Sequence, residues 1–101
     1  MKVITICGSM RFQNEMIKAA AELETKQGLC VLQPVYNCGG DAYSEQELQK
    51  LAAAHYKKID ISDAIYVVNV GGYIGESTTR EIEYAKRLNK EIVYMEQLWL
   101  F

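Results

Sequence analysis

The 101-residue sequence has a single proline, no long apolar segment and only a small excess of acidic over basic residues. Without a run of about 20 apolar residues it offers no membrane-spanning helix, and its N-terminus lacks the apolar core and cleavage site of a secretion signal. Its 11 basic and 13 acidic residues include no Lys/Arg cluster, so there is no basic surface for DNA or RNA. We therefore expect a cytosolic protein with neither membrane nor nucleic-acid partners. The length accommodates no second domain, so residues 1–101 are expected to form one domain.

Cysteine is also scarce. The three cysteines, Cys7, Cys30 and Cys38, lack the C-x-x-C or Cys/His spacing of a zinc site or redox pair, and two of them lie inside apolar runs. We therefore expect buried, reduced thiols, and we expect neither a metal nor any other cofactor.

Two kinds of apolar segment alternate along the chain. Short β-branched runs predict strands at 3–7, 30–32, 64–70 and 91–94, and apolar residues recurring every three or four positions predict helices at about 14–26, 44–59 and 78–88. Alternating strands and helices predict an α/β fold, flavodoxin-like or Rossmann-like. In this three-layer sandwich, helices cover both faces of a mostly parallel sheet of four or five strands.

Capping boxes mark the starts of the second and third predicted helices. Residues 44–47 match the S-x-x-E pattern and residues 78–81 match T-x-x-E. The second helix carries a mostly apolar stripe that is expected to face the core. The stripe consists of Leu48, Leu51, Ala52, His55 and Ile59. Lys57 and Lys58 are interpreted as the solvated end of this helix.

Ligands of parallel sheets bind beyond the carboxyl ends of the strands, where segments 8–11, 34–40 and 69–81 are expected to meet. The small residues Gly8 and Ser9 precede a helix N-terminus, whose backbone N–H groups can hold a phosphate or another anion. Ser9 can add a hydroxyl group and Arg11 a guanidinium group. An ordinary strand-to-helix turn has the same composition, and this alternative stays open.

Glu81 and His55 are the candidate catalytic residues at that edge, and each has a structural alternative. Glu81 either closes the capping box on Thr78 or faces the crevice as a nucleophile. His55, the only histidine, lies eight residues before Asp63, which is about 12 Å along a helix towards the ligand edge. It either transfers protons near neutral pH or is an inert core histidine. Asp63 itself is expected to make a turn or a helix-end hydrogen bond.

The segment that follows the third strand adds further candidate substrate-binding residues. They are Asn69, Gly72, Tyr73, Gly75 and Ser77. Tyr73 either stacks on a nucleobase or covers the loop, and Asn69 either binds ligand or stabilises the turn.

Three motifs in chain order resemble the nucleoside 2-deoxyribosyltransferase superfamily, which includes the deoxynucleoside 5'-monophosphate N-glycosidases. They are C-G-S-M-R at 7–11, S-D-A-I-Y-V-V-N at 62–69, and the G-x-x-x-x-x-E-x-x-x-A segment at 75–85. The longest agreement, over residues 58–95, is similar to a small branch of that superfamily. The resemblance covers most of the chain.

The resemblance implies an enzyme that hydrolyses or transfers the N-glycosidic bond of a nucleoside or nucleotide. By position, Glu81 matches the carboxylate that attacks the anomeric carbon, and Ser9 and Arg11 match residues that contact a 5'-phosphate. Two positions depart from the family. His55 stands where the family has its second carboxylate, and Thr5 stands where the hydrolases have a tyrosine. The alternative is therefore a non-catalytic module of the same fold that binds or senses a nucleotide.

The last residues of the sequence are strongly apolar. Leu98, Trp99, Leu100 and Phe101 are expected to form either an edge strand or a contact between subunits. The resemblance implies assembly in which neighbouring subunits complete each other's sites. We therefore expect a homo-oligomer, a dimer or a larger assembly.

Overall fold

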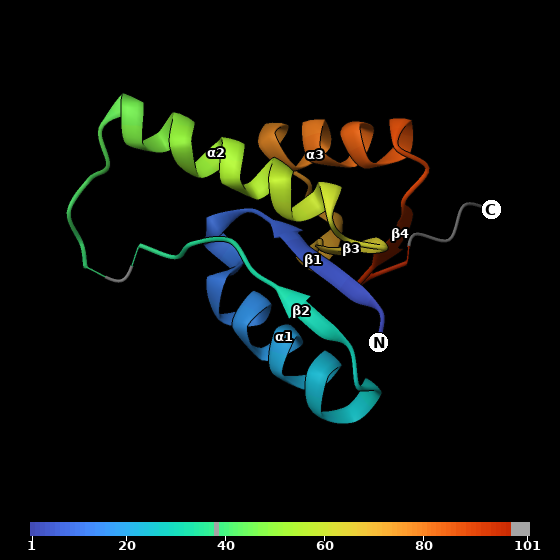
Figure 1. Cartoon of the computed structure of the whole chain (residues 1–101). Coiled ribbons are helices and arrows are strands. Elements are labelled where there is room, and N and C mark those ends of the chain that lie inside the picture. The colour runs from blue at the N-terminus through green and yellow to red at the C-terminus, as the bar shows by residue number, and fades with distance from the viewer. Residues whose placement is uncertain (38, 98–101) are drawn as a thin grey trace.

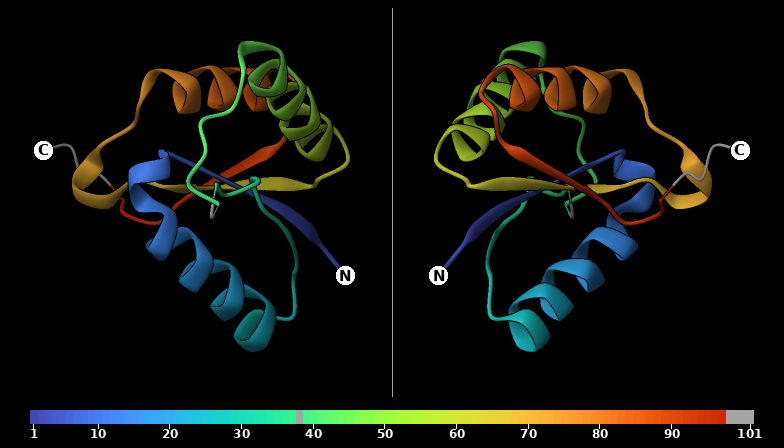
Figure 2. Two further views of the ribbon diagram at one scale, coloured as in Figure 1. Left: turned by 90° about the vertical axis from the view of Figure 1, so that its left-hand side faces the viewer. Right: turned by 90° about the vertical axis from the view of Figure 1, so that its right-hand side faces the viewer.

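Four parallel strands and three helices make up the computed structural model, which describes residues 1–37 and 39–97. The strands are β1 (Val3–Gly8), β2 (Cys30–Leu32), β3 (Ala64–Val68) and β4 (Glu91–Tyr94), in the sheet order β2-β1-β3-β4. The helices are α1 (Gln13–Gln27), α2 (Glu45–Asp60) and α3 (Glu76–Arg87). Helix α1 covers one face of the sheet, and α2 and α3 cover the other (Figures 1 and 2). The predicted α/β sandwich is confirmed, with four strands.

Each face of the sheet has its own apolar core. On one face, Met16 and Leu23 of α1 pack with Ile4 and Ile6 of β1. Because successive strand residues point to opposite faces, Cys7 belongs to the other core, beneath α2 and α3. Full burial of each large aliphatic side chain contributes roughly 1.5–3 kcal/mol.

The order of the strands places a crevice at the carboxyl ends of β1 and β3. The chain leaves β1 through α1 to reach β2 on one side, and returns through α2 to β3 on the other side. Such a reversal is where open α/β sheets bind ligands. Gly8 pairs with Val68 at this edge, and a Cβ on Gly8 would lie only 3.1 Å from Met16 Sδ and from the Val68 carbonyl oxygen. A glycine therefore allows this close approach of β1 to its neighbours.

The capping box predicted at 44–47 is confirmed, and the one predicted at 78–81 is wrong. Ser44 and Glu47 exchange side-chain-to-backbone hydrogen bonds of 2.8 and 3.1 Å at the start of α2. Helix α3 instead begins at Glu76 after an extended Gly75, with no side-chain cap. The T-x-x-E pattern therefore lies inside the helix, because glycine can end the preceding loop without a capping side chain. Glu81 consequently sits beyond the first turn of α3.

Strand β3 ends two residues earlier than predicted, and a short 3-10 helix at Val70–Gly72 follows it. Gly71 and Gly72 have φ values of 65° and 83°, a left-handed conformation that stops the strand. At the opposite end of β3, Asp63 accepts a 2.8 Å hydrogen bond from the Val3 backbone N–H, as expected for a structural role.

Some expectations fall on the sequence outside the described residues. The edge strand or subunit contact predicted for 98–101 and the state of Cys38 belong to this part of the chain. Among residues 1–37 and 39–97, no helix is both long enough and apolar enough to cross a membrane.

Candidate active site

A pocket of about 680 Å³ opens at the carboxyl ends of β1 and β3. This volume falls within the range of roughly 300–1,000 Å³ that small-molecule sites occupy. Its walls come from the turn after β1, the loop after β2, helix α2, and the segment entering α3. Of the candidate residues, those that line it are Gly8, Ser9, His55, Tyr73, Gly75, Ser77 and Glu81.

The other three candidates, Arg11, Asn69 and Gly72, lie outside this lining. The Arg11 guanidinium lies over the Tyr73 ring, 4.0 Å from its centroid. Asn69 is fully buried and makes two 2.9 Å hydrogen bonds to the backbone of Glu96, one from its amide group and one to its carbonyl oxygen. Of its two possible roles, Asn69 therefore has the structural one in this geometry, while Arg11 stays within reach of the pocket through Tyr73.

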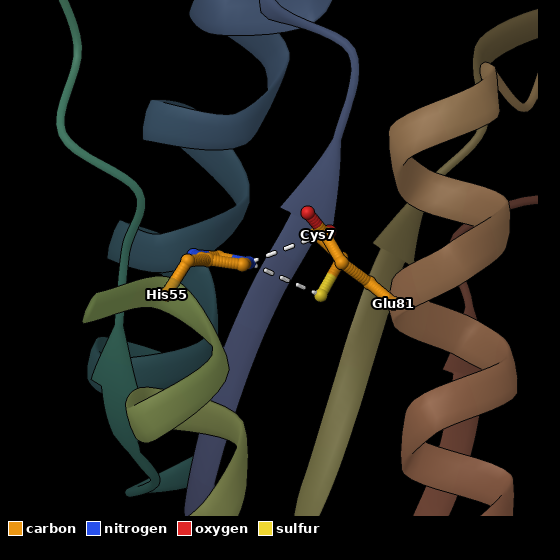
Figure 3. A group of neighbouring side chains, drawn as sticks. All are labelled: Cys7, His55 and Glu81. Carbon is orange, nitrogen blue, oxygen red and sulfur yellow. Dashed lines mark hydrogen bonds and ion pairs between the residues drawn. The ribbon is translucent and has the colours of Figure 1, made fainter. Parts of the chain in front are cut away.

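Glu81, His55 and Cys7 converge from three different elements (Figure 3), and of the three, His55 and Glu81 line the pocket. Glu81 Oε1 lies 3.4 Å from His55 Nε2, and Cys7 Sγ lies 3.5 Å from the same nitrogen. The Glu81 carboxylate thus faces side chains of α2 and β1. Its side chain keeps 17% of its surface exposed, so the pocket can reach it.

The two-residue repeat of strands and the three- to four-residue repeat of helices explain how these three side chains come to face one another. Alternation along β1 directs Cys7 towards α2 and α3. His55 and the fully buried Ile59 share one face of α2 at a four-residue spacing, which brings the histidine against the sheet. On α3, Thr78, Glu81, Ile82 and Ala85 recur at three- and four-residue spacing along the inward face. Glu81 is therefore held where its helix packs on β1.

The Cys7 thiol is uncharged near neutral pH. Burial raises its pKa well above the ordinary value, and the negative charge of Glu81 and a hydrogen bond to that carboxylate raise it further. A protonated thiol is a poor nucleophile. The anionic, pocket-facing group that remains for covalent chemistry in this cluster is the Glu81 carboxylate.

Several pocket residues were missed or misread from the sequence. Lys58 is half-buried and donates a 2.6 Å hydrogen bond to the Gln33 carbonyl, so its interpretation as a solvated helix end is wrong. Leu48 and Leu51 line the pocket, although their stripe was expected to face the core. An apolar stripe has the same periodicity whether it faces a core or a ligand pocket. In the sequence, the feature that indicates a pocket at Leu48 and Leu51 is their position next to the long loop after β2.

No family model matches the sequence, and no curated protein matches it. The fold is similar to that of a 2-desoxiribosyltransferase from Leishmania mexicana, with a TM-score of 0.64 and 20% identity over 93% of this chain and 63% of that one. A conserved protein from Enterococcus faecalis V583 is similar with a TM-score of 0.64 and 16% identity over 93% of this chain and 62% of that one. The chain thus shares the fold of these two solved chains and spans less than two thirds of their length.

Proposed function

We propose that this protein hydrolyses or transfers the N-glycosidic bond of a nucleoside or nucleotide, with Glu81 as the nucleophile. The observation that carries the proposal is the position of the Glu81 carboxylate. It reaches a ligand-sized pocket and lies next to His55 and Cys7, away from the helix N-terminus where it would only cap. The fold is similar to that of a 2-desoxiribosyltransferase, and this similarity supports the proposed chemistry.

In the proposed reaction, a Glu81 oxygen attacks the anomeric carbon of the sugar. A carbon–oxygen bond forms while the bond to the nucleobase breaks, and the bonding electrons leave with the base. Water or a second base then displaces the sugar and frees the carboxylate. His55 contacts one carboxylate oxygen, which leaves the other free to attack. The histidine, whose ring nitrogen lies at this carboxylate, also supplies a proton to the departing base.

The remaining pocket residues are proposed to hold the two ends of the substrate. The Gly8–Ser9 turn and Arg11 bind the anionic end, where a 5'-phosphate would meet backbone N–H groups and a guanidinium. Tyr73 covers the nucleobase, and Gly75 and Ser77 border the sugar beside Glu81. Gly72 and Asn69 shape the loop that presents Tyr73.

A nucleotide-binding module without turnover is the second candidate. It is favoured by the departures at Thr5 and His55, where the resembled hydrolases have a tyrosine and a carboxylate. Thr5 is fully buried and hydrogen-bonded to Ser62 at 2.6 Å, so it does not replace a tyrosine that reaches substrate.

The test is release of free base from a panel of nucleosides and nucleoside 5'-monophosphates by the wild type and by Glu81→Gln. We expect release by the wild type and none by the variant, because an amide is not a nucleophile. Glu83→Gln, an exposed glutamate on the same helix, is the matched control and should retain activity.

Base release by Glu81→Gln at the wild-type rate would contradict the proposal. If no substrate is turned over, thermal unfolding with the same panel identifies the second candidate. A ligand present at 100 times its dissociation constant adds about 2.7 kcal/mol to the free energy of unfolding.

A further inference from the structure

We propose that Cys7, His55 and Glu81 form a binding site for an exchangeable zinc ion. The three side chains offer a sulfur, a nitrogen and an oxygen, all lying within 4.8 Å of one another. This donor set is typical of zinc, which binds cysteine, histidine and carboxylate ligands. The site shares Glu81 and His55 with the proposed active site, but zinc binding does not depend on the glycosidic activity.

Two of the three spacings in this cluster match the coordination of zinc, and the third, from sulfur to carboxylate oxygen, lies within 4.8 Å. With Zn–S bonds of about 2.3 Å and Zn–N and Zn–O bonds of about 2.0–2.2 Å, a tetrahedral ion separates sulfur from nitrogen by about 3.6 Å and nitrogen from oxygen by about 3.4 Å. The corresponding distances here are 3.5 Å from Cys7 Sγ to His55 Nε2 and 3.4 Å from His55 Nε2 to Glu81 Oε1. An ion can therefore bind with little movement of the backbone.

The distance between His55 and Glu81 fits a direct hydrogen bond less well. A charge-assisted bond between an imidazole and a carboxylate is about 2.7–2.9 Å long, which is shorter than the 3.4 Å seen for His55 and Glu81. One N–H on Nε2 also cannot point along both lines drawn from it in Figure 3. A cation between the three atoms would satisfy all of them together.

The surroundings leave one coordination position open. Cys7 is fully buried beneath α2 and α3, and His55 is nine-tenths buried, while Glu81 borders the pocket. Three protein ligands that come from β1, α2 and α3 thus hold one side of the ion, and a water molecule from the pocket completes the tetrahedron. This arrangement is typical of zinc sites that keep an open position.

The second ring nitrogen of His55 determines how firmly the ion is held. Among the residues that the structure describes, His55 Nδ1 has no hydrogen-bond partner although it is buried. No partner fixes the tautomer, so Nε2 is free to present its lone pair to the metal. Zinc-binding histidines are usually strengthened by a partner on the other nitrogen, and this support is missing here. We therefore infer an exchangeable ion and not a permanent structural one.

Binding of zinc changes the charge of the cluster. The thiol of Cys7 releases its proton to solvent and binds as a thiolate, and the divalent cation offsets the negative charges of the thiolate and of Glu81. The bound ion also takes the Glu81 carboxylate. If the proposed function holds, zinc therefore inhibits the reaction reversibly, and a chelator restores it.

Cobalt(II) is the probe that tests the site, because it replaces zinc and gives a sulfur-to-metal charge-transfer band when a thiolate binds it. The Cys30→Ser/Cys38→Ser variant retains Cys7 as its only cysteine, and zinc-free protein of this variant should show the band. Addition of one equivalent of zinc should abolish it. No band in this variant would overturn the proposal.

Ligand variants measure the contribution of each residue to zinc affinity. Glu81→Gln and His55→Asn should weaken zinc binding by at least about 100-fold, more than the 10- to 100-fold lost with a hydrogen-bond partner of a ligand. Glu83→Gln should bind zinc as the wild type does. Wild-type affinity in Glu81→Gln and His55→Asn would overturn the site. These readouts use binding alone, so they are independent of base release.

Discussion

At the scale of single residues, the chemistry of the site depends on a buried thiol that stays neutral beside a carboxylate. Cys7 is enclosed by His55 of α2 and Glu81 of α3. Because the thiol carries no charge, Glu81 is not repelled by a neighbouring thiolate.

The raised pKa of Cys7 predicts a decrease in stability at alkaline pH. Above the ordinary thiol value of 9.0 the unfolded chain loses the Cys7 proton, whereas the folded protein retains it because burial raises its pKa. The free energy of unfolding therefore falls as pH rises, by up to about 1.4 kcal/mol per pH unit. Chemical denaturation should show this slope in the wild type and a shallower one in Cys7→Ser. Tyr36 and Tyr66 also have raised pKa values, and they contribute equally to both proteins. Equal slopes would contradict the prediction.

The residues of the site differ in how far the sequence could predict them. Glu81 could be assigned to the ligand edge because it follows the end of the third strand. His55 could be assigned there from the rise per residue of the helix that precedes that strand. The contact between Glu81, His55 and Cys7 could not, because positions 7, 55 and 81 meet only after three elements pack together. The role of Glu81 stayed open for a further reason: T-x-x-E has the same spacing in a cap and inside a helix.

At the scale of elements, the site depends on the ends of β3 and β4 being joined. The Asn69 side chain bonds both the N–H and the carbonyl of Glu96, and the Gly71 N–H donates a 3.0 Å hydrogen bond to a Glu96 side-chain oxygen. These bonds fix the loop that leads through Tyr73 into α3. The start of α3, and with it the position of Glu81, follows from this connection.

Asn69→Ala should lower the free energy of unfolding by about 2–3 kcal/mol, because two part-buried hydrogen bonds are lost and both the N–H and the carbonyl of Glu96 lose this partner. Denaturant unfolding measures the change. Asn69→Asp keeps the acceptor oxygen but buries a charge against the Glu96 carbonyl, so it should lose at least as much stability as Asn69→Ala. A loss below about 0.5 kcal/mol in Asn69→Ala would show that the side chain does not hold the turn.

The elements themselves were largely predictable, since strand and helix periodicities are local. Strands 30–32 and 91–94 have the predicted bounds, and α1 differs by one residue at each end. The end of β3 and the start of α3 were missed because both depend on glycine. Gly71 and Gly75 can adopt several conformations, and the packing around them selects one. The half-buried position of Lys58 likewise depends on the loop after β2, which has no periodic pattern.

At the scale of the whole molecule, one chain offers a shallow site. The pocket is bordered on one side by the loop after β2, and the chain spans only 62–63% of the length of the similar solved chains. We propose that a second copy of the chain covers part of the pocket, as the resembled superfamily implies. The apolar residues 98–101 are the proposed contact.

Light scattering at micromolar concentration should therefore report about twice 11.5 kDa or a larger multiple. Deletion of residues 98–101 should lower that mass, because the proposed apolar contact is lost. Substitution of Ile61, an exposed residue at the end of α2, by serine is the control and should leave the mass unchanged. A wild-type protein that stays monomeric when concentrated would contradict this assembly.

The central claim for the whole molecule is that Glu81 carries the sugar as a covalent intermediate. A 2'-fluorinated nucleoside slows departure of the sugar from the enzyme, so that the intermediate can accumulate before acid quenching and mass spectrometry. We expect a mass increase equal to one glycosyl group, located by peptide mapping on Glu81 and absent from Glu81→Gln. A sugar attached to another residue, or the same adduct on Glu81→Gln, would contradict it.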